Sequence, residues 1–431
     1  MSYFEILKSD HPHLASPLKG EEKTGRARIG IIHTAHGDIK TPAFLPIGTK
    51  GAVKAVTSEE LKFWGADIIL ANTYHLWQRP GDALIYKAGG LHKFMNWKGP
   101  IFTDSGGFQV FSLSKMRKVM EAGVLFQFDL DGKQEILSPE KSIQIQANLG
   151  SDIALILDDF PGYPFEYERS KQSIELTKRW AERAIKEHER IVKHGDPINP
   201  HQKLWGIVQG ASFEDLRKQS ALDMVNLGVE GFAIGGVAVG EPQEEMLKAV
   251  EAAILNLPEN APKHLLGVGT PFDIVQAVAR GCDTFDCVIP TREARHGRLY
   301  VSAKYHPSLA LPIKERENQA IPPPRGGRLG GGEQVEGYQT INVGLEKYRE
   351  DFTPVDNACD CYLCLNHTKS YLRHLFATGE PLAIRLATMH NLKFYLNLMA
   401  KIRKAIEYDY FGEMVANYKE FKDATLSEVE G

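Results

Sequence analysis

The stretch SDIALILDD, residues 151–159, decides the fold. Its continuous apolar run, Ile153 to Leu157, is short and is typical of a strand buried on both faces of a parallel sheet. Two carboxylates, Asp158 and Asp159, follow the run directly. Strands of this kind occur where helices cover both faces of a sheet, and their carboxyl ends then gather at one edge.

Seven similar runs lie on both sides of this stretch, and each is followed by a helix-period segment or a connector. They are AFLPIGT (43–49), ADIILANT (66–73), GPIFTD (99–104), KLWGIVQG (203–210), GFAIGGVA (231–238), HLLGVG (264–269) and TFDCVI (284–289). Eight strands that alternate with helices predict an α/β fold, a (β/α)8 TIM barrel. A doubly wound open sheet is the alternative. The third unit fits least well, because its linker, 105–136, is long and irregular.

Two helix starts support this count. Thr57 with Glu60 predicts a capping box, and Ser138 followed by Pro139 predicts an N-cap and the first helical position. Before the barrel, residues 27–44 predict a β-hairpin that turns at 36–38 and covers one barrel end. After it, IPPPRGGRLGGGE (321–333) has too few apolar residues to pack a core and predicts a flexible segment.

The predicted organisation therefore has four parts. They are an N-terminal extension with the hairpin lid (1–42), the catalytic barrel (43–303), a Gly/Pro-rich insert (304–340) and a zinc-binding helical subdomain (341–431). The 431 residues are 43% hydrophobic and 25% charged, which is ordinary for a globular protein. A net charge of −4 means that a polyanion would have to bind a local basic patch. The sequence contains neither a long apolar run nor a signal peptide, so we expect a cytoplasmic protein without membrane contact.

Acidic residues follow three of the predicted strands: Asp104, the pair Asp158 and Asp159, and Asp286. In a barrel the C-terminal ends of all strands form one mouth, so these carboxylates are expected to meet there. A single aspartate at a strand end is more often a helix cap or a turn residue. Four on one rim favour catalysis.

Glycines and an amide accompany the acids. The pairs Gly106-Gly107 and Gly235-Gly236 allow the backbone to approach a flat ligand closely, although such a pair is usually only a turn. Gln209 ends the strand GIVQG, and its amide both donates and accepts hydrogen bonds, as recognition of a nucleobase edge requires. A satisfied core glutamine is the equally favoured alternative.

Three of the five cysteines form a CxCxxC motif, Cys359, Cys361 and Cys364. With His390 they make three thiolates and one imidazole, the closed tetrahedral set of a structural zinc. His367 and His374 are competing ligands. We prefer His390 because it begins the next predicted helix and can face back toward the cysteines.

Taken in order, six motifs resemble the bacterial tRNA-guanine transglycosylases, over about residues 25–410. The motifs are FTDSGGFQV (102–110), GIVQG (206–210), GFAIGGVAVGE (231–241), GVGTP (267–271), FDCVIPTREAR (285–295) and CDCYLC with MHN (359–364 and 389–391). The resemblance implies exchange of the wobble guanine of tRNAs with a GUN anticodon for a 7-deazaguanine base, in queuosine biosynthesis. It also implies a homodimer with one structural zinc ion per subunit.

The resemblance assigns a role to each candidate residue. Asp286 would be the covalent nucleophile and Asp104 the general acid and base. Substrate binding would involve Asp158, Gln209, Gly236, Ser105, Asn72, Phe108, Glu241 and Leu266. Arg292 and Arg295 would hold the RNA, and ordinary surface arginines are the alternative. His75 would help to orient the carboxylates.

Two departures bear on the substrate. Bacterial relatives commonly have Asp-Glu-Cys where this chain has Asp158-Asp159-Phe160. Val239 keeps the bacterial residue at a position where eukaryotic relatives that use queuine have glycine. Both residues favour a small substituent such as aminomethyl over the cyclopentenediol of queuine. Because the chain ends soon after the zinc segment, we also expect an anticodon target.

Three other functions are considered. The first is a transglycosylase that salvages queuine. The second is a non-catalytic tRNA-binding subunit, which the presence of both Asp104 and Asp286 disfavours. The third is a metal-dependent barrel hydrolase, which would require pairs of histidines at the strand ends, where we find only His75.

Overall fold

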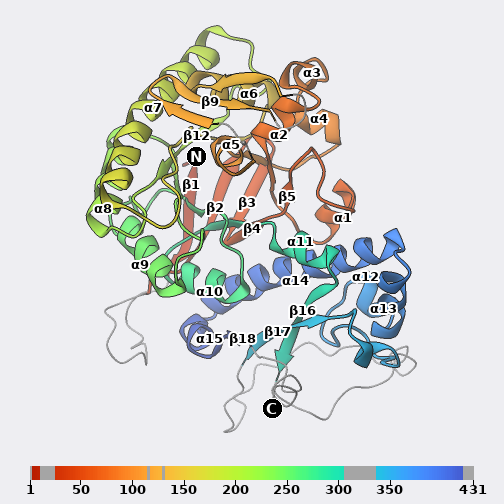
Figure 1. Cartoon of the computed structure of the whole chain (residues 1–431). Helices are drawn as coiled ribbons and strands as arrows, with labels where there is room; N and C mark the ends of the chain where they lie inside the picture. Colours follow the sequence, from red (N-terminus) through yellow and green to blue (C-terminus); the bar gives the residue numbers. More distant parts are fainter. Residues whose placement is uncertain (1, 10–24, 114–116, 129–131, 305–335, 421–431) are drawn as a thin grey trace. The chain divides into compact units, whose positions relative to one another are not determined.

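The computed structural model describes residues 2–9, 25–113, 117–128, 132–304 and 336–420 (Figure 1). The chain forms two compact units. Unit 1 comprises Met1–Val53, Thr57–Val288 and Met399–Asp409, and unit 2 comprises Lys54–Val56, Ile289–Leu398 and Tyr410–Gly431. Most of the predicted insert lies outside the described residues.

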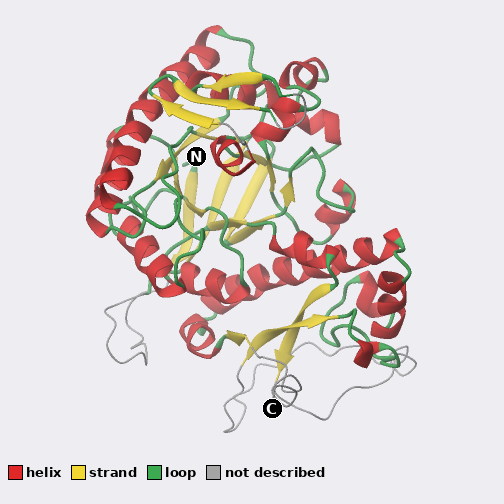
Figure 2. Ribbon diagram, in the orientation of Figure 1, coloured by secondary structure: helices red, strands yellow, loops and turns green. Residues whose placement is uncertain are grey.

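Unit 1 is built on a parallel barrel. Its nine strands follow the order β4-β15-β14-β13-β12-β11-β7-β6-β5. They are β4 (Ala43–Leu45), β5 (Ile47–Gly48), β6 (Ile69–Ala71), β7 (Ile101–Thr103), β11 (Ile153–Leu155), β12 (Lys203–Val208), β13 (Gly231–Ile234), β14 (Lys263–Leu265) and β15 (Thr284–Asp286). Every neighbouring pair is parallel. Figure 2 shows these strands ringed by helices.

The first predicted strand is split in two. Only Pro46 separates β4 from β5, and these two strands stand at opposite ends of the strand order. Proline has no N–H to donate to a ladder, so the strand changes partner there. The Pro46 carbonyl still accepts from Leu70 N at 3.0 Å. The ring is therefore continuous through one chain segment, which confirms the predicted barrel and excludes the open sheet.

Helices surround the barrel and its mouth. They are α1 (Ser58–Phe63), α2 (Thr73–Gln78), α3 (Asp82–Lys87), α4 (Leu91–Met95), α5 (Gly107–Leu113), α6 (Pro139–Leu149), α7 (Tyr167–His194), α8 (Glu214–Asn226), α9 (Gln243–Ile254) and α10 (Pro271–Ala279). Both predicted helix starts are confirmed: Thr57 and Glu60 form the capping box of α1, and Ser138 caps α6 with Pro139 in its first turn. Among the described residues, no helix is long and apolar enough to span a membrane.

The irregular third unit contains structure that the sequence analysis missed. After α5 come three antiparallel strands, β8 (Arg117–Met120), β9 (Gly123–Gln127) and β10 (Gln134–Leu137).

The barrel interior contains aromatic side chains. The Phe102 ring lies 5.3 Å from that of Trp205 and 4.8 Å from that of His264, and all three side chains are buried.

The predicted hairpin is present within a three-stranded sheet, β1 (Phe4–Ser9), β2 (Arg28–Thr34) and β3 (Gly37–Thr41). Its turn lies at 35–36, one residue before the predicted 36–38, and β1 was not predicted. Arg28 donates from Nε and Nη2 to the two oxygens of Asp283, at 2.8 and 2.6 Å. Asp283 immediately precedes β15, so this sheet contacts the N-terminal ends of the barrel strands.

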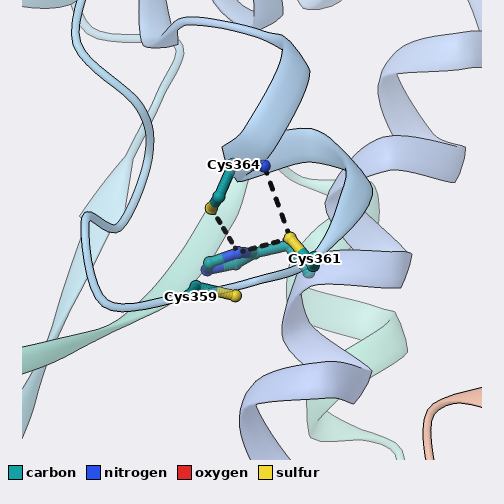
Figure 3. Close-up of side chains that lie close together, drawn as sticks. Cys359, Cys361 and Cys364 are labelled. Carbon is teal, nitrogen blue, oxygen red and sulfur yellow. Dashed lines mark hydrogen bonds between the residues drawn. The ribbon is translucent and has the colours of Figure 1, made fainter. Parts of the chain in front are cut away.

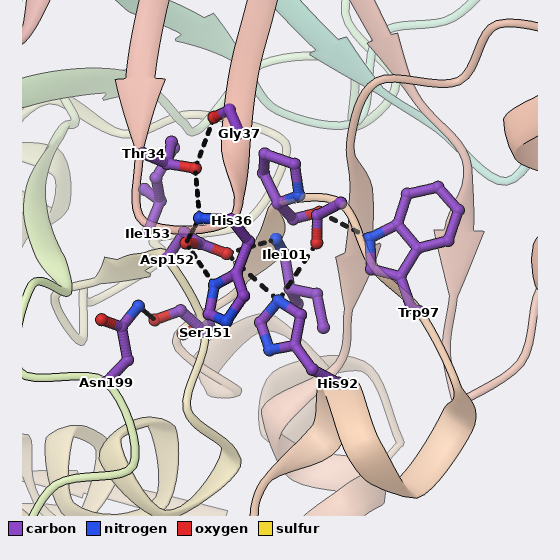
Figure 4. Close-up of polar contacts among 12 residues, drawn as sticks. Thr34, His36, Gly37, His92, Trp97, Ile101, Ser151, Asp152, Ile153 and Asn199 are labelled. Carbon is purple, nitrogen blue, oxygen red and sulfur yellow. Dashed lines mark hydrogen bonds and ion pairs between the residues drawn. The ribbon is translucent and has the colours of Figure 1, made fainter.

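The hairpin turn is held by Asp152, which precedes β11 (Figure 4). Its Oδ1 accepts from the His36 backbone N at 3.2 Å and contacts the His36 ring Nδ1 at 2.8 Å. Its Oδ2 accepts from Ile101 N at 2.9 Å and lies 3.3 Å from His92 Nε2. Two histidines and a carboxylate are residue types that bind metal ions, but both oxygens of Asp152 already have hydrogen-bond donors from the protein. We interpret the cluster as a structural anchor.

Unit 2 combines helices with a small sheet. Its elements are α11 (Ile289–Arg295), β16 (Arg298–Lys304), β17 (Glu336–Asn342), η2 (Glu346–Tyr348), α12 (Tyr362–Asn366), α13 (Lys369–Ala377), the greater part of α14 (Pro381–Glu407), α15 (Phe411–Asn417) and β18 (Lys419–Glu420). The three-stranded sheet of β16, β17 and β18 was not predicted. β16 lies at the end of the predicted barrel (43–303), β17 begins in the predicted flexible insert (304–340), and β18 lies in the segment predicted to be helical.

Candidate active site and metal centre

The predicted acids lie at the C-terminal ends of the barrel strands. Asp104 directly follows β7, Asp158 follows the run that contains β11, and Asp286 is the last residue of β15. These ends face away from the end that the N-terminal sheet contacts. Asp286 is close enough to raise the pKa of Asp104 through charge repulsion, so the two carboxylates share one site.

Asp104 is held by groups from two neighbouring turns. Its Oδ1 accepts from the backbone N–H groups of Thr73, at 3.0 Å, and Gly106, at 3.1 Å. Its Oδ2 accepts from Asn72 Nδ2 at 2.5 Å. The Asn72 side-chain oxygen also caps α2 by accepting from His75 N, which fixes the orientation of its amide. Burial, with a contribution from Asp286, nevertheless raises the pKa of Asp104 to about 7.

Asp158 is positioned by two side chains. Ser105 Oγ donates to its Oδ1 at 3.3 Å, and Gln209 Nε2 donates to its Oδ2 at 2.6 Å. Burial raises the pKa of Asp158 to about 6, and the neighbouring Asp159 adds to the shift. Asp159 itself points elsewhere and forms a bidentate ion pair with Arg169, at 2.6 and 2.7 Å. Of the two consecutive acids, only Asp158 therefore belongs to the site.

Gln209 has an unused acceptor. Its Oε1 is buried and has no hydrogen-bond partner among the described residues, so it is not a satisfied core glutamine. This oxygen faces Gly236, where an added Cβ would lie only 2.2 Å away. Gly236 also has a φ of +66°, in the left-handed region. The backbone conformation and the close approach of the Gln209 side chain therefore both favour glycine at this position.

The loop after Gly236 is fixed by Glu241. The two oxygens of this carboxylate accept from the backbone N–H groups of Ala238, at 2.5 Å, and Val239, at 2.9 Å. Ala238 has a φ of +59°, which is uncommon for a residue with a side chain. Glu241 thus holds the loop in a conformation that its sequence alone disfavours.

Asp286 is supported by groups from the neighbouring strand, β14, and from the turn that follows it. Its Oδ1 lies 3.1 Å from His264 Nε2 and accepts from Gly267 N at 3.1 Å. The other ring nitrogen of His264 lies 2.9 Å from Thr284 Oγ1. The sequence analysis missed His264, because it counted only His75 at the strand ends. The alternation of side chains along HLLGVG would have placed it inside the barrel.

Aromatic and apolar side chains complete the surroundings. Phe108, which is half-exposed, packs edge-on against Phe160 at 5.7 Å between ring centres. Phe111, from the same helix as Phe108, also packs edge-on against Phe160, at 4.7 Å between ring centres. Leu266 follows β14 and lies near Gly235, where an added Cβ would be 3.5 Å from Leu266 Cδ1.

The predicted RNA-binding arginines belong to unit 2. Both lie on α11, where Arg292 Nε is 3.7 Å from Glu293 Oε1 and Arg295 Nη1 donates to Thr291 O at 3.0 Å. The Arg292 side chain is about half exposed. Their contact with RNA stays a prediction.

Unit 2 contains the predicted metal donors. Cys359, Cys361, Cys364 and His390 are all buried, and their donor atoms lie within 4.8 Å of one another (Figure 3). His390 Nδ1 is 3.5 Å from Cys361 Sγ and 3.3 Å from Cys364 Sγ, while its Nε2 lies 2.7 Å from Tyr300 O. Three sulfurs and one nitrogen suit a structural Zn²⁺. His367 and His374 are not part of this group.

The described residues offer no comparable group at the barrel mouth. Their second set of possible metal donors, His36, His92 and Asp152, lies at the N-terminal end of the strands. A metal-dependent hydrolase would need its donors where the substrate binds. The arrangement of donors therefore disfavours the hydrolase hypothesis.

Comparison with known proteins agrees with the predicted resemblance. A family model described as queuine tRNA-ribosyltransferase matches residues 22–423. A protein of Listeria innocua with that name is 48% identical over 392 residues, covering 91% of this chain and 92% of the relative. One of Streptococcus gordonii is 48% identical over 413 residues, covering 96% and 97%. One of Halothermothrix orenii is 48% identical over 393 residues, covering 91% and 93%.

Proposed function

Because the chain belongs to the queuine tRNA-ribosyltransferase family, we propose that it exchanges the wobble guanine of tRNAs with a GUN anticodon for a 7-deazaguanine base. The observation that carries this proposal is the group of three carboxylates at one barrel mouth, with Asp286 presented as a nucleophile and Asp104 and Asp158 tuned by burial. Each has a separate task in the exchange.

Asp286 attacks C1′ of the ribose. Its Oδ1 is engaged by His264 and Gly267, whereas its Oδ2 makes no hydrogen bond to a described residue and is available to attack. The C1′–N9 bond breaks and its electron pair leaves with guanine, so an ester joins the ribose to Asp286. A carboxylate suits this step, because its negative charge stabilises the oxocarbenium character of the transition state.

Asp104 moves the proton. With a pKa of about 7, it carries a proton in part of the population at neutral pH and can deliver it to the departing base. The resulting carboxylate then removes a proton from the incoming base, whose nitrogen attacks C1′ and releases Asp286. Hydrogen bonds from Asn72, Thr73 and Gly106 hold the carboxylate in one orientation for both transfers.

Asp158, Gln209 and the Gly236 N–H select the base. The ionised Asp158 accepts from the N1–H and the exocyclic amine of guanine, and Gln209 and Gly236 face its carbonyl oxygen. Adenine or a pyrimidine would leave buried polar groups unpaired, at a loss of roughly 1–3 kcal/mol for each group. The unpaired Gln209 Oε1 supports a ligand at this place, because a buried amide atom without a partner indicates a missing ligand. An amide oxygen only accepts, so the carbonyl oxygen of guanine would be bound by the Gln209 Nε2 end of the amide and by the Gly236 N–H.

The substrate is a structured RNA whose target base must leave its stack. The nucleotide has to be splayed out before C1′ and the base edge can reach the carboxylates. Arg292 and Arg295, which follow Asp286 in sequence, would hold the neighbouring phosphates. A tRNA substrate also implies that the enzyme works in the cytoplasm.

The preferred base is 7-aminomethyl-7-deazaguanine. Phe160, which contacts the rings of Phe108 and Phe111, fills space beside Asp158, and Val239 adds bulk to the loop that Glu241 fixes. Both side chains oppose the large substituent of queuine. Salvage of queuine is the alternative.

Zn²⁺ and a second subunit complete the proposed enzyme. Cys359, Cys361, Cys364 and His390 would hold one structural Zn²⁺, which joins the segment after β17 to α14 and takes no part in the chemistry. For a homodimer, support comes from exposed aromatic side chains in the same unit. Tyr362 is 54% exposed, and the ring of Tyr371, 38% exposed, stacks on that of His367 at 4.9 Å.

The test is incorporation of radiolabelled guanine into an unmodified tRNA with a GUN anticodon. Wild type should incorporate the label, whereas Asp286→Asn, which keeps the shape of the side chain, and a tRNA with adenosine at the wobble position should not. Unlabelled 7-aminomethyl-7-deazaguanine should compete better than queuine. No incorporation by folded wild type would favour the non-catalytic subunit, and stronger competition by queuine would favour salvage.

A further inference from the structure

Arg217 is a fully buried arginine on α8 that lies behind the base-selecting residues. Its Nε donates to Ala211 O at 2.7 Å, and its Nη1 donates to Val208 O at 3.0 Å and Gly235 O at 2.7 Å. Its Nη2 donates to Gly236 O at 3.1 Å. Every partner is a backbone carbonyl, and no carboxylate among the described residues forms an ion pair with it.

An unpaired buried cation is unusual, because burial without a counter-charge is unfavourable. Burial lowers the pKa of Arg217 to about 9, which still leaves the guanidinium charged at neutral pH. The carboxylate that favours the charged form of Arg217 is that of Glu241, whose oxygens already accept from the N–H groups of Ala238 and Val239. The fold therefore retains a positive charge at this place without neutralising it.

The peptide groups bound by Arg217 direct their N–H groups away from it. In a trans peptide the C=O and the following N–H point in opposite directions. Because Gly235 O and Gly236 O accept from the guanidinium, the N–H groups of Gly236 and Val237 point to the other side. Neither of these N–H groups has a hydrogen-bond partner among the described residues. A hydrogen bond to the C=O polarises the peptide and strengthens its N–H as a donor.

We propose that Arg217 is a positioning residue that makes the Gly236 and Val237 N–H groups a receptor for the anionic form of the base. This inference rests on the proposed function. When the C1′–N9 bond breaks, the electron pair stays on guanine and spreads over its ring system as far as the carbonyl oxygen. The polarised N–H groups stabilise that charge until Asp104 transfers its proton to the base. The incoming base passes through the same anion in reverse.

The experiment compares two bases as inhibitors of labelled-guanine exchange. Guanine stays neutral in mildly alkaline buffer, whereas 8-azaguanine ionises there because its extra ring nitrogen acidifies the N–H. The variants are Arg217→Met, which removes the charge, and Arg217→Lys, which keeps it. Arg28→Met is the matched control, because Arg28 is also buried but binds Asp283 at the opposite end of the barrel.

Arg217→Met should weaken 8-azaguanine relative to guanine by about tenfold, as expected for loss of one charge in a partly buried site. Arg217→Lys should restore most of that ratio, and Arg28→Met should leave it unchanged. Equal weakening of both bases by Arg217→Met, or no recovery with lysine, would mean that Arg217 is only structural and would overturn the proposal.

A measurement on wild type alone covers the case in which the variants do not fold. As pH rises through the ionisation of 8-azaguanine, its inhibition should strengthen relative to that of guanine. Taking the ratio at each pH removes the titration of Asp104 and Asp158, which affects both bases. A ratio that falls on ionisation would contradict the proposal. If wild type exchanges no guanine at all, the proposed function fails, and that result is distinct from either outcome.

Discussion

Replacing Asp104 by asparagine should stabilise the folded protein at alkaline pH while it abolishes base exchange. The folded state raises the pKa of this carboxyl from 3.8 to about 7. A shift of roughly 3 units, at about 1.4 kcal/mol each, opposes folding by about 4 kcal/mol once the group is ionised. Because the folded-state pKa is raised, protonated Asp104 makes its full contribution to stability below about pH 4. That contribution is lost as the pH rises through about 7, where the carboxyl ionises.

Two effects reduce the gain. Asp104 is only half-buried, so water screens the charge and roughly halves the penalty. In Asp104→Asn the new amide would also face Asn72 Nδ2, and two donors cannot bond, which loses about 1 kcal/mol. The remaining stabilisation is about 1 kcal/mol at about pH 8 and disappears as the pH is lowered.

The assay is unfolding by urea, followed by tryptophan fluorescence, for wild type and Asp104→Asn across this pH range. Asp283→Asn is the control with the opposite sign. It removes the partner of the buried Arg28 and should destabilise the protein by about 3–5 kcal/mol. The reasoning would be refuted if Asp104→Asn were less stable than wild type at about pH 8, or if the stability difference did not change with pH.

Three further predictions follow from the same structure. Inhibition by guanine should weaken below about pH 6, because protonation of Asp158 removes the acceptor for N1–H. Asp158→Asn should abolish this pH dependence, and a flat wild-type profile would contradict the assignment. Elemental analysis should find one zinc per wild-type chain and per chain of His374→Ala but less in His390→Ala, and equal zinc in both variants would refute the ligand set. Asp152→Asn should destabilise the protein by about 2 kcal/mol at neutral pH, because hydrogen bonds from His36 and His92 lower the pKa of Asp152 to about 2. The difference in stability should vanish as the pH falls through about 2. A difference that persists there would show that the charge of Asp152 is not its cause.

The barrel could be predicted because its strands are continuous apolar runs that end in acids and glycines. Because the C-terminal ends of barrel strands lie at one end of the barrel, the sequence also predicted that Asp104, Asp158 and Asp286 lie together there, without knowledge of their contacts. Pro46 was visible in the sequence, but its effect on strand pairing depends on which neighbours flank the strand. The hairpin turn was displaced by one residue for a related reason, since register is set by pairing.

Other features depend on long-range contacts that periodicity does not report. The pairing of β16 with β17 joins the end of the predicted barrel to the last residues of the predicted insert, and these two segments are far apart in the sequence. His264 acts at the site because of its register inside the barrel, not because of a motif. Arg217 was missed because its function arises from four carbonyls that only the folded loops bring together.

The central claim is that Asp286 carries the ribose during exchange, and mass spectrometry of a quenched reaction tests it most directly. The enzyme would be mixed with its tRNA in the absence of a replacement base, denatured, and digested with a protease and a ribonuclease. We predict a ribosyl adduct on the peptide that contains Asp286, and none in Asp286→Asn. An adduct on Asp104, or exchange that proceeds in Asp286→Asn, would contradict the account.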